Sequence, residues 1–293
     1  MGFNFNFDTQ SSEKLTAKIK SSNPENQINK SDNPELKIQK YIYNEINNFD
    51  HYNKNNGQNQ KLVCIDETVS GKNSDPIWYL TILDEKSDLI PNKYEGGKVV
   101  WECSLDLIKY FSGNPSLQQQ LDLKSPVKLL ELGCGQALPS IWLLKNSKNL
   151  QNIQFSEIHL QDYNSSVTEE ILPTVLNANE MENFQDRIDL ISGDWSDYSE
   201  KIKSKDEPKK FNLIIACECT YNEEYYDKFH KTLEAASDEN TVIIISMKSH
   251  YFGPGGSYFA WEKFVTVKGV FRIEVLQESE HVLPRIIFCM RKK

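Results

Sequence analysis

Short apolar runs alternate with stretches of helical spacing over most of the chain after Lys61. Five continuous apolar runs predict strands buried on both faces: Val127–Leu132, Phe155–Leu160, Ile188–Ile191, Phe211–Ala216 and Val242–Met247. Helical stretches between such strands are typical of a parallel α/β sheet. Two β-rich runs follow, 267–276 and 282–290, and the residues between them are too few for a crossover helix. We therefore expect a mostly parallel, Rossmann-like sheet that ends in an antiparallel hairpin.

The pattern before this sheet predicts two smaller elements. Residues 62–65 and 77–83 are β-rich and flank a turn-like segment, which predicts an N-terminal β-hairpin. Apolar positions recur at helical spacing over Trp101–Phe111 and predict an amphipathic helix. We expect this helix to end at the Ser-Gly-Asn-Pro sequence of residues 112–115.

Residues 1–60 differ in composition from the rest of the chain. They contain 13 Asn and few aliphatic residues, which is too little apolar surface to offset the chain entropy lost on folding. We expect this segment to be mostly disordered and residues 61–293 to form one domain. Within the segment, the Phe-Asn-Phe-Asn-Phe sequence of residues 3–7 resembles half a strand, and a partly helical spacing over 36–49 predicts a short helix.

Composition excludes several classes of function. With 42 acidic and 33 basic residues the net charge is −9, so the chain lacks the basic footprint of a nucleic-acid-binding protein and would instead attract a basic protein. No apolar run approaches the roughly 18 residues that span a bilayer. The six cysteines form no Cys-x-x-Cys pair and no zinc-like spacing with His. We expect reduced thiols, no bound metal, and a protein of the cytoplasm and nucleus.

The strongest local signal is a strand that runs into a Gly-rich turn and then a helix, over Leu129–Pro139. Glycine lets the backbone approach a ligand, and a helix N-terminus supplies unpaired N–H groups for an anion. A dinucleotide fingerprint needs Gly or Ala at position 138, where this chain has Leu. Glu131 before Gly133, with the small Ala137, instead matches S-adenosylmethionine binding, in which the anion is the methionine carboxylate. A Gly-rich turn without a ligand is the alternative.

Acidic residues follow the next two predicted strands. Asp162 comes at the end of the second strand, where a carboxylate can accept two hydrogen bonds from ribose hydroxyls. Asp194 and Trp195 follow the third strand, where the carboxylate can accept from the adenine amine and the indole offers a face to the ring. The alternatives are a helix N-cap for Asp162 and a core position for Trp195.

The fourth predicted strand leads into Cys217-Glu218-Cys-Thr-Tyr221-Asn222, at the edge where open α/β sheets bind ligands. Glu218 and Tyr221 form an acidic-x-x-aromatic motif that would face the transferring methyl. Enzymes that methylate amino groups of nucleic acids usually have Asn or Asp followed by Pro-Pro and an aromatic residue here, and this chain does not. Alternatively, Glu218 caps a helix and Tyr221 packs in the core.

Six stretches together match a known family: residues 3–7, 96–104, 130–139, 161–164, 218–222 and 247–256. Through them the chain resembles the seven-strand, class I S-adenosylmethionine-dependent methyltransferases of the family sixteen type. Among these it resembles the eukaryotic protein-histidine methyltransferases that modify large-subunit ribosomal protein L-three. The Tyr-Phe-Gly-x-Gly-Gly sequence of residues 251–256 is the most discriminating, because general lysine enzymes of this type lack it. The resemblance covers roughly residues 61–290.

The resemblance implies a set of cofactor-binding residues: Val100, Trp101, Glu102, Cys103, Ser104, Gly133, Gly135, Asp162, Tyr163, Asn164, Gly193, Asp194, Trp195 and Cys217. Residues 101–103 would help to close over the cofactor and Gly133 would approach it. Residues 162–164 would take its ribose side, and residues 193–195 would surround adenine.

Glu218, Tyr221 and Asn222 are the implied catalytic residues. A neutral imidazole already has a lone pair, so the enzyme needs only to orient the ring and accept a proton afterwards. Glu218 would hold one ring N–H and so present Nε2 of the target histidine to the methyl. Two positions depart from the family and bear on substrate contacts: Cys217, where Ser is usual, and His250, where Tyr or a similar residue is usual.

The resemblance thus implies an enzyme that transfers the methyl of S-adenosyl-L-methionine to Nε2 of a histidine in ribosomal protein L-three. We expect a monomer whose partner is that protein, without membrane association or sequence-specific nucleic-acid binding. A lysine methyltransferase of the same fold shares the acidic-x-x-aromatic motif and is the first alternative. A non-catalytic S-adenosylmethionine-binding assembly factor and a small-molecule methyltransferase are the others.

Overall fold

The structure is a computed structural model. It describes residues 34–42, 60–72, 74–82, 96–114, 116–150, 153–203, 208–253 and 255–293. The disorder predicted for residues 1–33 and 43–59, and the Phe-Asn-Phe-Asn-Phe sequence, lie outside the described residues.

One mixed sheet holds eight strands in the order β1-β6-β5-β4-β7-β8-β10-β9. These strands are β1 (Lys37–Lys40), β4 (Val127–Leu132), β5 (Phe155–Asp162), β6 (Ile188–Ser192), β7 (Leu213–Cys217), β8 (Val242–Lys248), β9 (Phe271–Glu278) and β10 (Arg285–Lys292). The central strands β4 to β8 are parallel, whereas β10 runs antiparallel to both β8 and β9. A separate antiparallel pair consists of β2 (Gln60–Cys64) and β3 (Trp78–Ile82).

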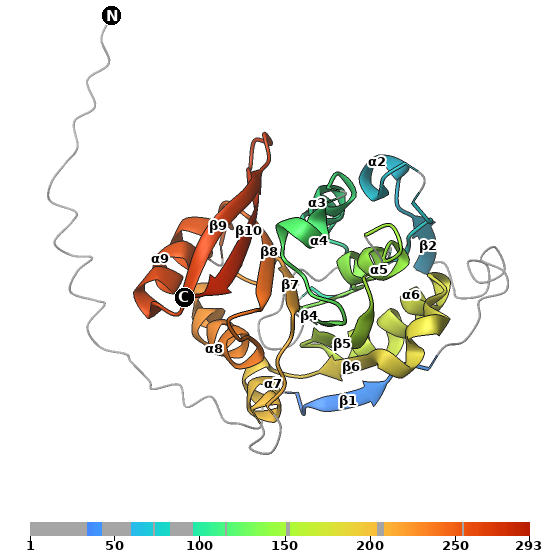
Figure 1. Cartoon of the computed structure of the whole chain (residues 1–293), viewed down its shortest axis with the longest axis horizontal. Helices are drawn as coiled ribbons and strands as arrows, with labels where there is room; N and C mark the ends of the chain where they lie inside the picture. The colour runs from blue at the N-terminus through green and yellow to red at the C-terminus, as the bar shows by residue number, and fades with distance from the viewer. Residues whose placement is uncertain are drawn as a thin grey trace, which may run out of the picture. The chain divides into compact units, whose positions relative to one another are not determined.

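Helices cover both faces of the sheet (Figure 1). On one face lie α3 (Glu102–Ser112), α5 (Leu138–Lys145) and α6 (Leu172–Ala178), and on the other lie α7 (Trp195–Ile202), α8 (Tyr226–Ala236) and α9 (Tyr258–Lys268). Shorter helical segments are α2 (Glu67–Ser70), α4 (Leu117–Gln120), η2 (Val167–Ile171), η3 (Met181–Arg187) and η4 (Glu223–Tyr225). Along β4, Leu129 packs into the first core and Leu130 into the second, so strand alternation builds two cores.

The structure confirms the predicted α/β architecture. All five predicted buried strands form within two residues of their predicted bounds, the N-terminal hairpin is the β2–β3 pair, and α3 occupies the predicted helix. The C-terminal hairpin also forms, but its first strand begins at Phe271. Residues 267 and 268 instead end α9, which Gly269 caps in the left-handed conformation at φ +73°.

The helix predicted over residues 36–49 is wrong in the part that the structure describes. Residues 37–40 form β1, which pairs antiparallel with β6 at the edge of the sheet. The β1 side chains are all exposed, so backbone pairing with the buried β6, and not a helical apolar face, decides the local conformation. A Cβ at Gly193 would lie 2.9 Å from the Cα of Leu36, so glycine there permits the approach. Residues 37–40 therefore belong to the sheet, which has eight strands instead of seven.

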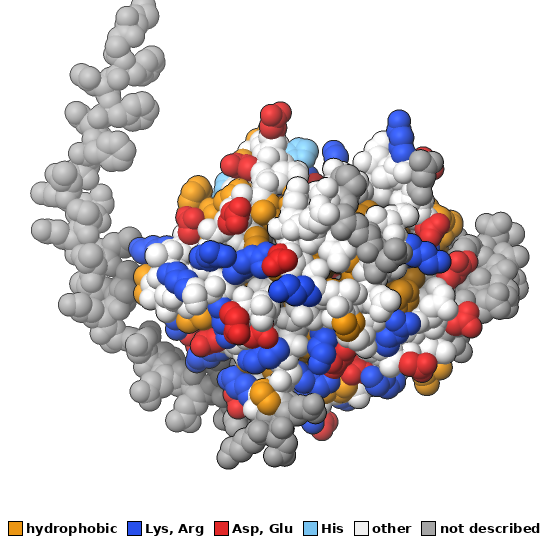
Figure 2. Space-filling view, in the orientation of Figure 1, with side chains coloured by type: hydrophobic (Ala, Val, Ile, Leu, Met, Phe, Trp, Pro, Cys, Tyr) orange, Lys and Arg blue, Asp and Glu red, His pale blue; other side chains and the backbone are white. Residues whose placement is uncertain are grey.

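Figure 2 draws one face of the molecule with its side chains coloured by type. On the face shown in Figure 2, acidic and basic side chains are interspersed and neither sign dominates. None of the helices in the described ranges is long and apolar enough to cross a membrane.

Candidate active site

The loops that follow β4, β5, β6 and β7 meet at the carboxyl edge of the parallel strands, where they and the segment before α3 line one cavity. Most of the predicted site residues line it: Val100, Trp101, Ser104, Gly133, Gly135, Asp162, Tyr163, Gly193, Asp194, Trp195, Cys217, Glu218 and Tyr221. The remaining lining residues are Gly96, Gly97, Val99, Glu131, Cys134, Gln136, Ala137, Leu138, Cys219, Tyr225 and Lys228. Five segments that are separate in the sequence thus form one site.

The Gly-rich turn after β4 packs tightly against two other loops. Gly133 and Gly135 have φ values of +60° and +50°. A Cβ at Gly133 would lie 2.6 Å from the Sγ of Cys219, and one at Gly135 would lie 2.9 Å from the carbonyl oxygen of Gly97. Both positions therefore require glycine, and the turn presents backbone to the cavity.

Asp162, the last residue of β5, connects three of these loops. Its Oδ2 accepts a hydrogen bond from the N–H of Gly135 at 3.0 Å, and its Oδ1 accepts one from the N–H of Asn164 at 3.0 Å. A Cβ at Gly97 would come within 2.8 Å of both oxygens, so glycine there keeps the carboxylate open to the cavity. The geometry suits the predicted ribose contact.

Asp194 and Trp195 form another wall of the cavity together with Lys228 of α8. Asp194 caps α7, because its Oδ1 accepts a hydrogen bond from the N–H of Ser196 at 2.8 Å. Its Oδ2 pairs with the Nζ of Lys228 at 2.7 Å. The same Nζ lies 4.2 Å from the ring centroid of Tyr225 and 5.8 Å from that of Trp195. Asp194 therefore has two protein partners, and its predicted adenine contact stays a prediction.

Glu218 follows β7 in a strained conformation. Its φ is +56°, in the left-handed region, which costs a residue other than glycine on the order of 1–3 kcal/mol. Its side chain is 8% exposed, Tyr251 donates a hydrogen bond to its Oε2, and the Nζ of Lys248 lies 3.8 Å from its Oε1. The buried Oε1 accepts no hydrogen bond of normal geometry from the described residues. Glu218 thus combines a place in the cavity lining with a buried carboxylate oxygen that no described residue satisfies.

The groups around Glu218 control its charge. Burial raises the pKa of Glu218, and the Cys103 thiol, the Tyr251 hydroxyl and the Lys248 ammonium oppose that rise. Burial also raises the pKa values of Cys103 and Tyr251, so both remain protonated donors. Lys248 in turn pairs with Glu102 at 3.2 Å and lies 5.4 Å from the ring centroid of Trp101. These contacts connect Glu218 to the N-terminus of α3.

Glu131 is a further buried carboxyl group at the cavity, with 2% of its surface exposed. The N–H of Ser140, at 3.2 Å, and the Ser140 hydroxyl both donate to its Oε2. Burial raises the pKa of Glu131 to about 8, although these hydrogen bonds lower it. At neutral pH the side chain is mostly protonated, and a cationic ligand group would favour its ionised form.

Four predicted site residues do not line the cavity. Glu102 is more than half exposed beside Lys248, and Cys103 is buried near Glu218. Asn164 bonds to Asp162 through its backbone. Asn222 caps η4 by accepting a hydrogen bond from the N–H of Glu224 at 3.0 Å. Their predicted ligand or catalytic roles stay predictions.

Several residues of the cavity wall had no role predicted from the sequence, among them Gly97, Tyr225 and Lys228. The adjacent glycines at 96 and 97 were an available signal, because a glycine pair outside a turn motif often marks close backbone approach. Tyr225 and Lys228 lie at the start of an amphipathic helical stretch, where their residue types are ordinary, so no pattern singled them out.

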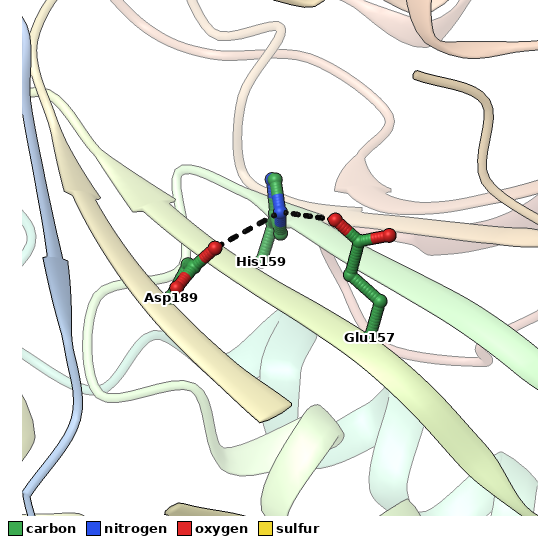
Figure 3. Close-up of side chains that lie close together, drawn as sticks. All are labelled: Glu157, His159 and Asp189. Carbon is green, nitrogen blue, oxygen red and sulfur yellow. Dashed lines mark hydrogen bonds and ion pairs between the residues drawn. The ribbon is translucent and has the colours of Figure 1, made fainter. Parts of the chain in front are cut away.

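A cluster of potential metal ligands lies among the described residues outside the cavity (Figure 3). The Nε2 of His159 lies 3.0 Å from the Oε1 of Glu157 and 3.4 Å from the Oδ2 of Asp189. Lys209 pairs with Glu157, and Lys40 pairs with Asp189 at 2.6 Å. Because lysine ammonium groups already neutralise both carboxylates, we interpret the cluster as a structural ion-pair network.

The cavity fits S-adenosylmethionine. The glycines of its two tight loops leave a cradle that any side chain would fill. Asp162, Trp195 and Glu131 line it, and they are the residues that would hold the ribose, the adenine and the ammonium of the bound cofactor. The bound cofactor would supply an electrophilic methyl. The sheet topology and this cavity together are those of the class I S-adenosylmethionine-dependent methyltransferase fold.

Comparison with known proteins gives the family. Residues 85–255 match the family described as lysine methyltransferase. Because this match covers more than half of the chain, the protein belongs to that family. Family membership confirms the predicted fold class and, with it, S-adenosylmethionine as the cofactor.

Individual relatives carry a more specific name. The histidine protein methyltransferase 1 homolog of Rattus norvegicus is 32% identical over 229 residues, which are 71% of this chain and 59% of that protein. The homolog of Dictyostelium discoideum is 31% identical over 210 residues, which are 71% of this chain and 60% of that protein. The chain thus spans about three fifths of the length of these curated relatives. Among solved structures, the O-methyltransferase from Bacillus cereus in complex with SAH is 13% identical, with a TM-score of 0.44, over 66% of this chain and 92% of that chain.

Proposed function

We propose that this protein transfers the methyl of S-adenosylmethionine to Nε2 of a histidine in large-subunit ribosomal protein L-three. The observation that carries the proposal is the buried carboxylate of Glu218, a residue that lines the cavity and whose Oε1 accepts no hydrogen bond of normal geometry from the described residues. A neutral imidazole fits this arrangement because it has one N–H to donate and one nitrogen lone pair to react.

Glu218 orients the target ring in this proposal. Its Oε1 accepts the N–H of Nδ1, so the lone pair of Nε2 points away from the carboxylate toward the methyl. Bound S-adenosylmethionine would supply the methyl to Nε2, which would leave the ring cationic and the cofactor sulfur neutral. The carboxylate stabilises that cation, and the Nδ1 proton then passes to it or to solvent. Tyr251 holds the other carboxylate oxygen throughout.

The charges near Glu218 favour a neutral target. Lys248 already lies 3.8 Å from Glu218, so the ammonium of a lysine substrate would enter beside a like charge. A histidine with a pKa near 6.5 is already neutral at about pH 7.5. The names of the relatives support histidine, whereas the family description supports lysine as the second candidate.

Methylation of recombinant L-three with methyl-labelled cofactor, followed by acid hydrolysis and amino-acid analysis, tests the proposal. We expect the label in Nε2-methylhistidine, and we expect Glu218→Gln to lose most of the rate while cofactor affinity stays unchanged. Label in methyl-lysine would support the second candidate. Cofactor binding without transfer to any protein would support the assembly-factor alternative.

A further inference from the structure

The loop between β8 and α9 contains the Tyr-Phe-Gly-x-Gly-Gly sequence of residues 251–256, and the proposed methyl transfer gives a role only to its Tyr251. Tyr251 points inward and donates a hydrogen bond to Glu218. The next residue, Phe252, is 80% exposed. Burying a phenylalanine side chain gains about 1.5–3 kcal/mol, so this position forgoes a sizeable stabilisation. Two neighbouring aromatic residues thus face the reacting carboxylate and the solvent, respectively.

Phe252 is not an isolated exposed residue. His250 is also exposed, and its ring meets the Phe252 ring edge-on with centroids 4.7 Å apart. The backbone N–H of Ser249 donates to the carbonyl oxygen of Pro284 at 2.7 Å, which joins this loop to the turn between β9 and β10. That turn carries Val282, whose side chain is fully exposed. We call His250, Phe252 and Val282 the rim.

The base of the loop is fixed to the segment that follows β7. The N–H of Gly256 donates to the carbonyl oxygen of Tyr221 at 3.0 Å, and the N–H of Tyr251 donates to that of Gly256 at 2.8 Å. A Cβ at Gly256 would lie closer than 3.0 Å to the backbone of Thr220 and Tyr221, so only glycine permits this contact. Backbone contacts therefore join the loop directly to the segment that carries Glu218.

The outer part of the loop depends on two glycines with positive φ. Gly253 and Gly255 have φ values of +92° and +89°, which other residues rarely adopt, and a Cβ at either would meet nothing within 4 Å. Glycine is thus required there by the backbone conformation and not by crowding. The turn holds Phe252 outward, one residue from a side chain that contacts Glu218.

We propose that the rim docks an apolar patch on the substrate protein, beside the histidine that is methylated. This inference rests on the proposed function. Exposed carboxylates at Glu223, Glu224 and Glu280 lie on the segments bonded to the loop, and the whole chain has a net charge of −9. A partner patch flanked by Lys or Arg is therefore complementary, whereas the phosphates of a nucleic acid are not.

Docking at the rim explains why an aromatic side chain is left in water at this position. Aromatic residues are among the strongest anchors of protein interfaces. Because the loop base is bonded to Tyr221, which lines the cavity, a protein held at Phe252 would place its neighbouring side chains close to that segment. The rim thus selects the substrate protein, and the cavity selects the residue within it.

Steady-state kinetics with recombinant L-three and labelled S-adenosylmethionine test the proposal. We expect Phe252→Ala to raise KM for the protein about tenfold, with kcat and cofactor affinity unchanged, and Val282→Ser to act in the same direction. The matched control is Val267→Ser at the far end of α9, which also removes an exposed apolar side chain, 78% exposed, and should change nothing. Phe252→Leu should restore much of the affinity. Unfolding midpoints show that all variants are folded.

An unchanged KM in Phe252→Ala, or an equal rise in Val267→Ser, overturns the proposal. So does inhibition of the wild type by added RNA that Phe252→Ala relieves, because the rim would then bind nucleic acid. If wild-type enzyme does not methylate L-three, the proposed function fails instead. The same variants are then compared by label incorporation into proteins from cells that lack the enzyme, where a loss confined to the rim variants supports docking and equal incorporation refutes it.

Discussion

Glu131 offers a test of the electrostatics that does not depend on the substrate. Its carboxyl group is buried at the cavity, and its pKa is raised from 4.5 to about 8. Glu131→Gln replaces it with a neutral side chain of the same shape that can still accept the hydrogen bonds from Ser140. The variant therefore mimics the protonated form and removes the titration.

The sign and size of the effect follow from linkage between protonation and folding. Below pH 4.5 Glu131 is protonated in both states and contributes no pH dependence. Between pH 4.5 and about 8 the unfolded chain has lost the proton while the folded protein keeps it, so the free energy of unfolding of the wild type falls as pH rises. At about 1.4 kcal/mol per pH unit, the wild type loses up to about 5 kcal/mol relative to Glu131→Gln across this window.

Urea unfolding of the cofactor-free protein, followed by circular dichroism between pH 5 and 8, measures this difference. Other groups titrate in the same range, so the relevant quantity is the difference between variant and wild type at each pH. The matched control is Glu170→Gln, an exposed position on η2. A stability difference that does not grow with pH for Glu131→Gln, or that grows equally for Glu170→Gln, refutes the buried protonated carboxyl.

Four further predictions concern the site. Asp162→Ala should weaken S-adenosylmethionine binding by about 1.5–3 kcal/mol in calorimetry, the usual loss for a charged hydrogen-bond partner, and unchanged affinity would remove it from the ribose role. Lys248→Met should move the acid limb of the pH profile of kcat/KM to higher pH, because burial raises the pKa of Glu218 and Lys248 opposes that rise. Lys248→Arg should restore the profile, and an acid limb that does not move in Lys248→Met would contradict this role of Lys248. Gly256→Ala should lower the free energy of unfolding by about 1–3 kcal/mol and should also lower the methylation rate, because the added Cβ would overlap the Thr220 backbone. A fully stable and active variant would argue against close packing at the base of the loop. Single-turnover rates with saturating substrate should rise through about pH 6 to 7 and then flatten for a histidine target, whereas a log-linear rise from pH 7.5 to 9 would indicate lysine.

Continuous apolar runs located the central strands because a parallel strand covered on both faces has few polar positions. Residue 127 begins β4 as predicted, and β8 extends only one residue beyond its run. The edge strand β1 could not be found this way. Its side chains are exposed and its conformation depends on β6, about 150 residues later, so no local pattern reports it.

The site residues also fall into those that a local sequence pattern identifies and those that it does not. Gly133, Asp162 and Glu218 could be found because each follows or ends a strand, and the strand ends converge on one edge. The contacts that set the charge of Glu218 could not be found. Lys248 reaches it from the end of β8 and Tyr251 from the loop that follows, and this approach depends on packing between distant segments, which no spacing in the sequence encodes.

The placement of β10 has a consequence for biosynthesis. β10 lies between β8 and β9 in the sheet, although it follows both in the chain. While the ribosome is still adding residues 285–292, β8 has an open edge and β9 lacks its neighbour. Such edges recruit other strands, so the nascent domain passes through an aggregation-prone state that ends only after this last segment emerges. Folding of the domain is therefore completed after translation of β10, and a chaperone that covers the edge of β8 would act in that interval.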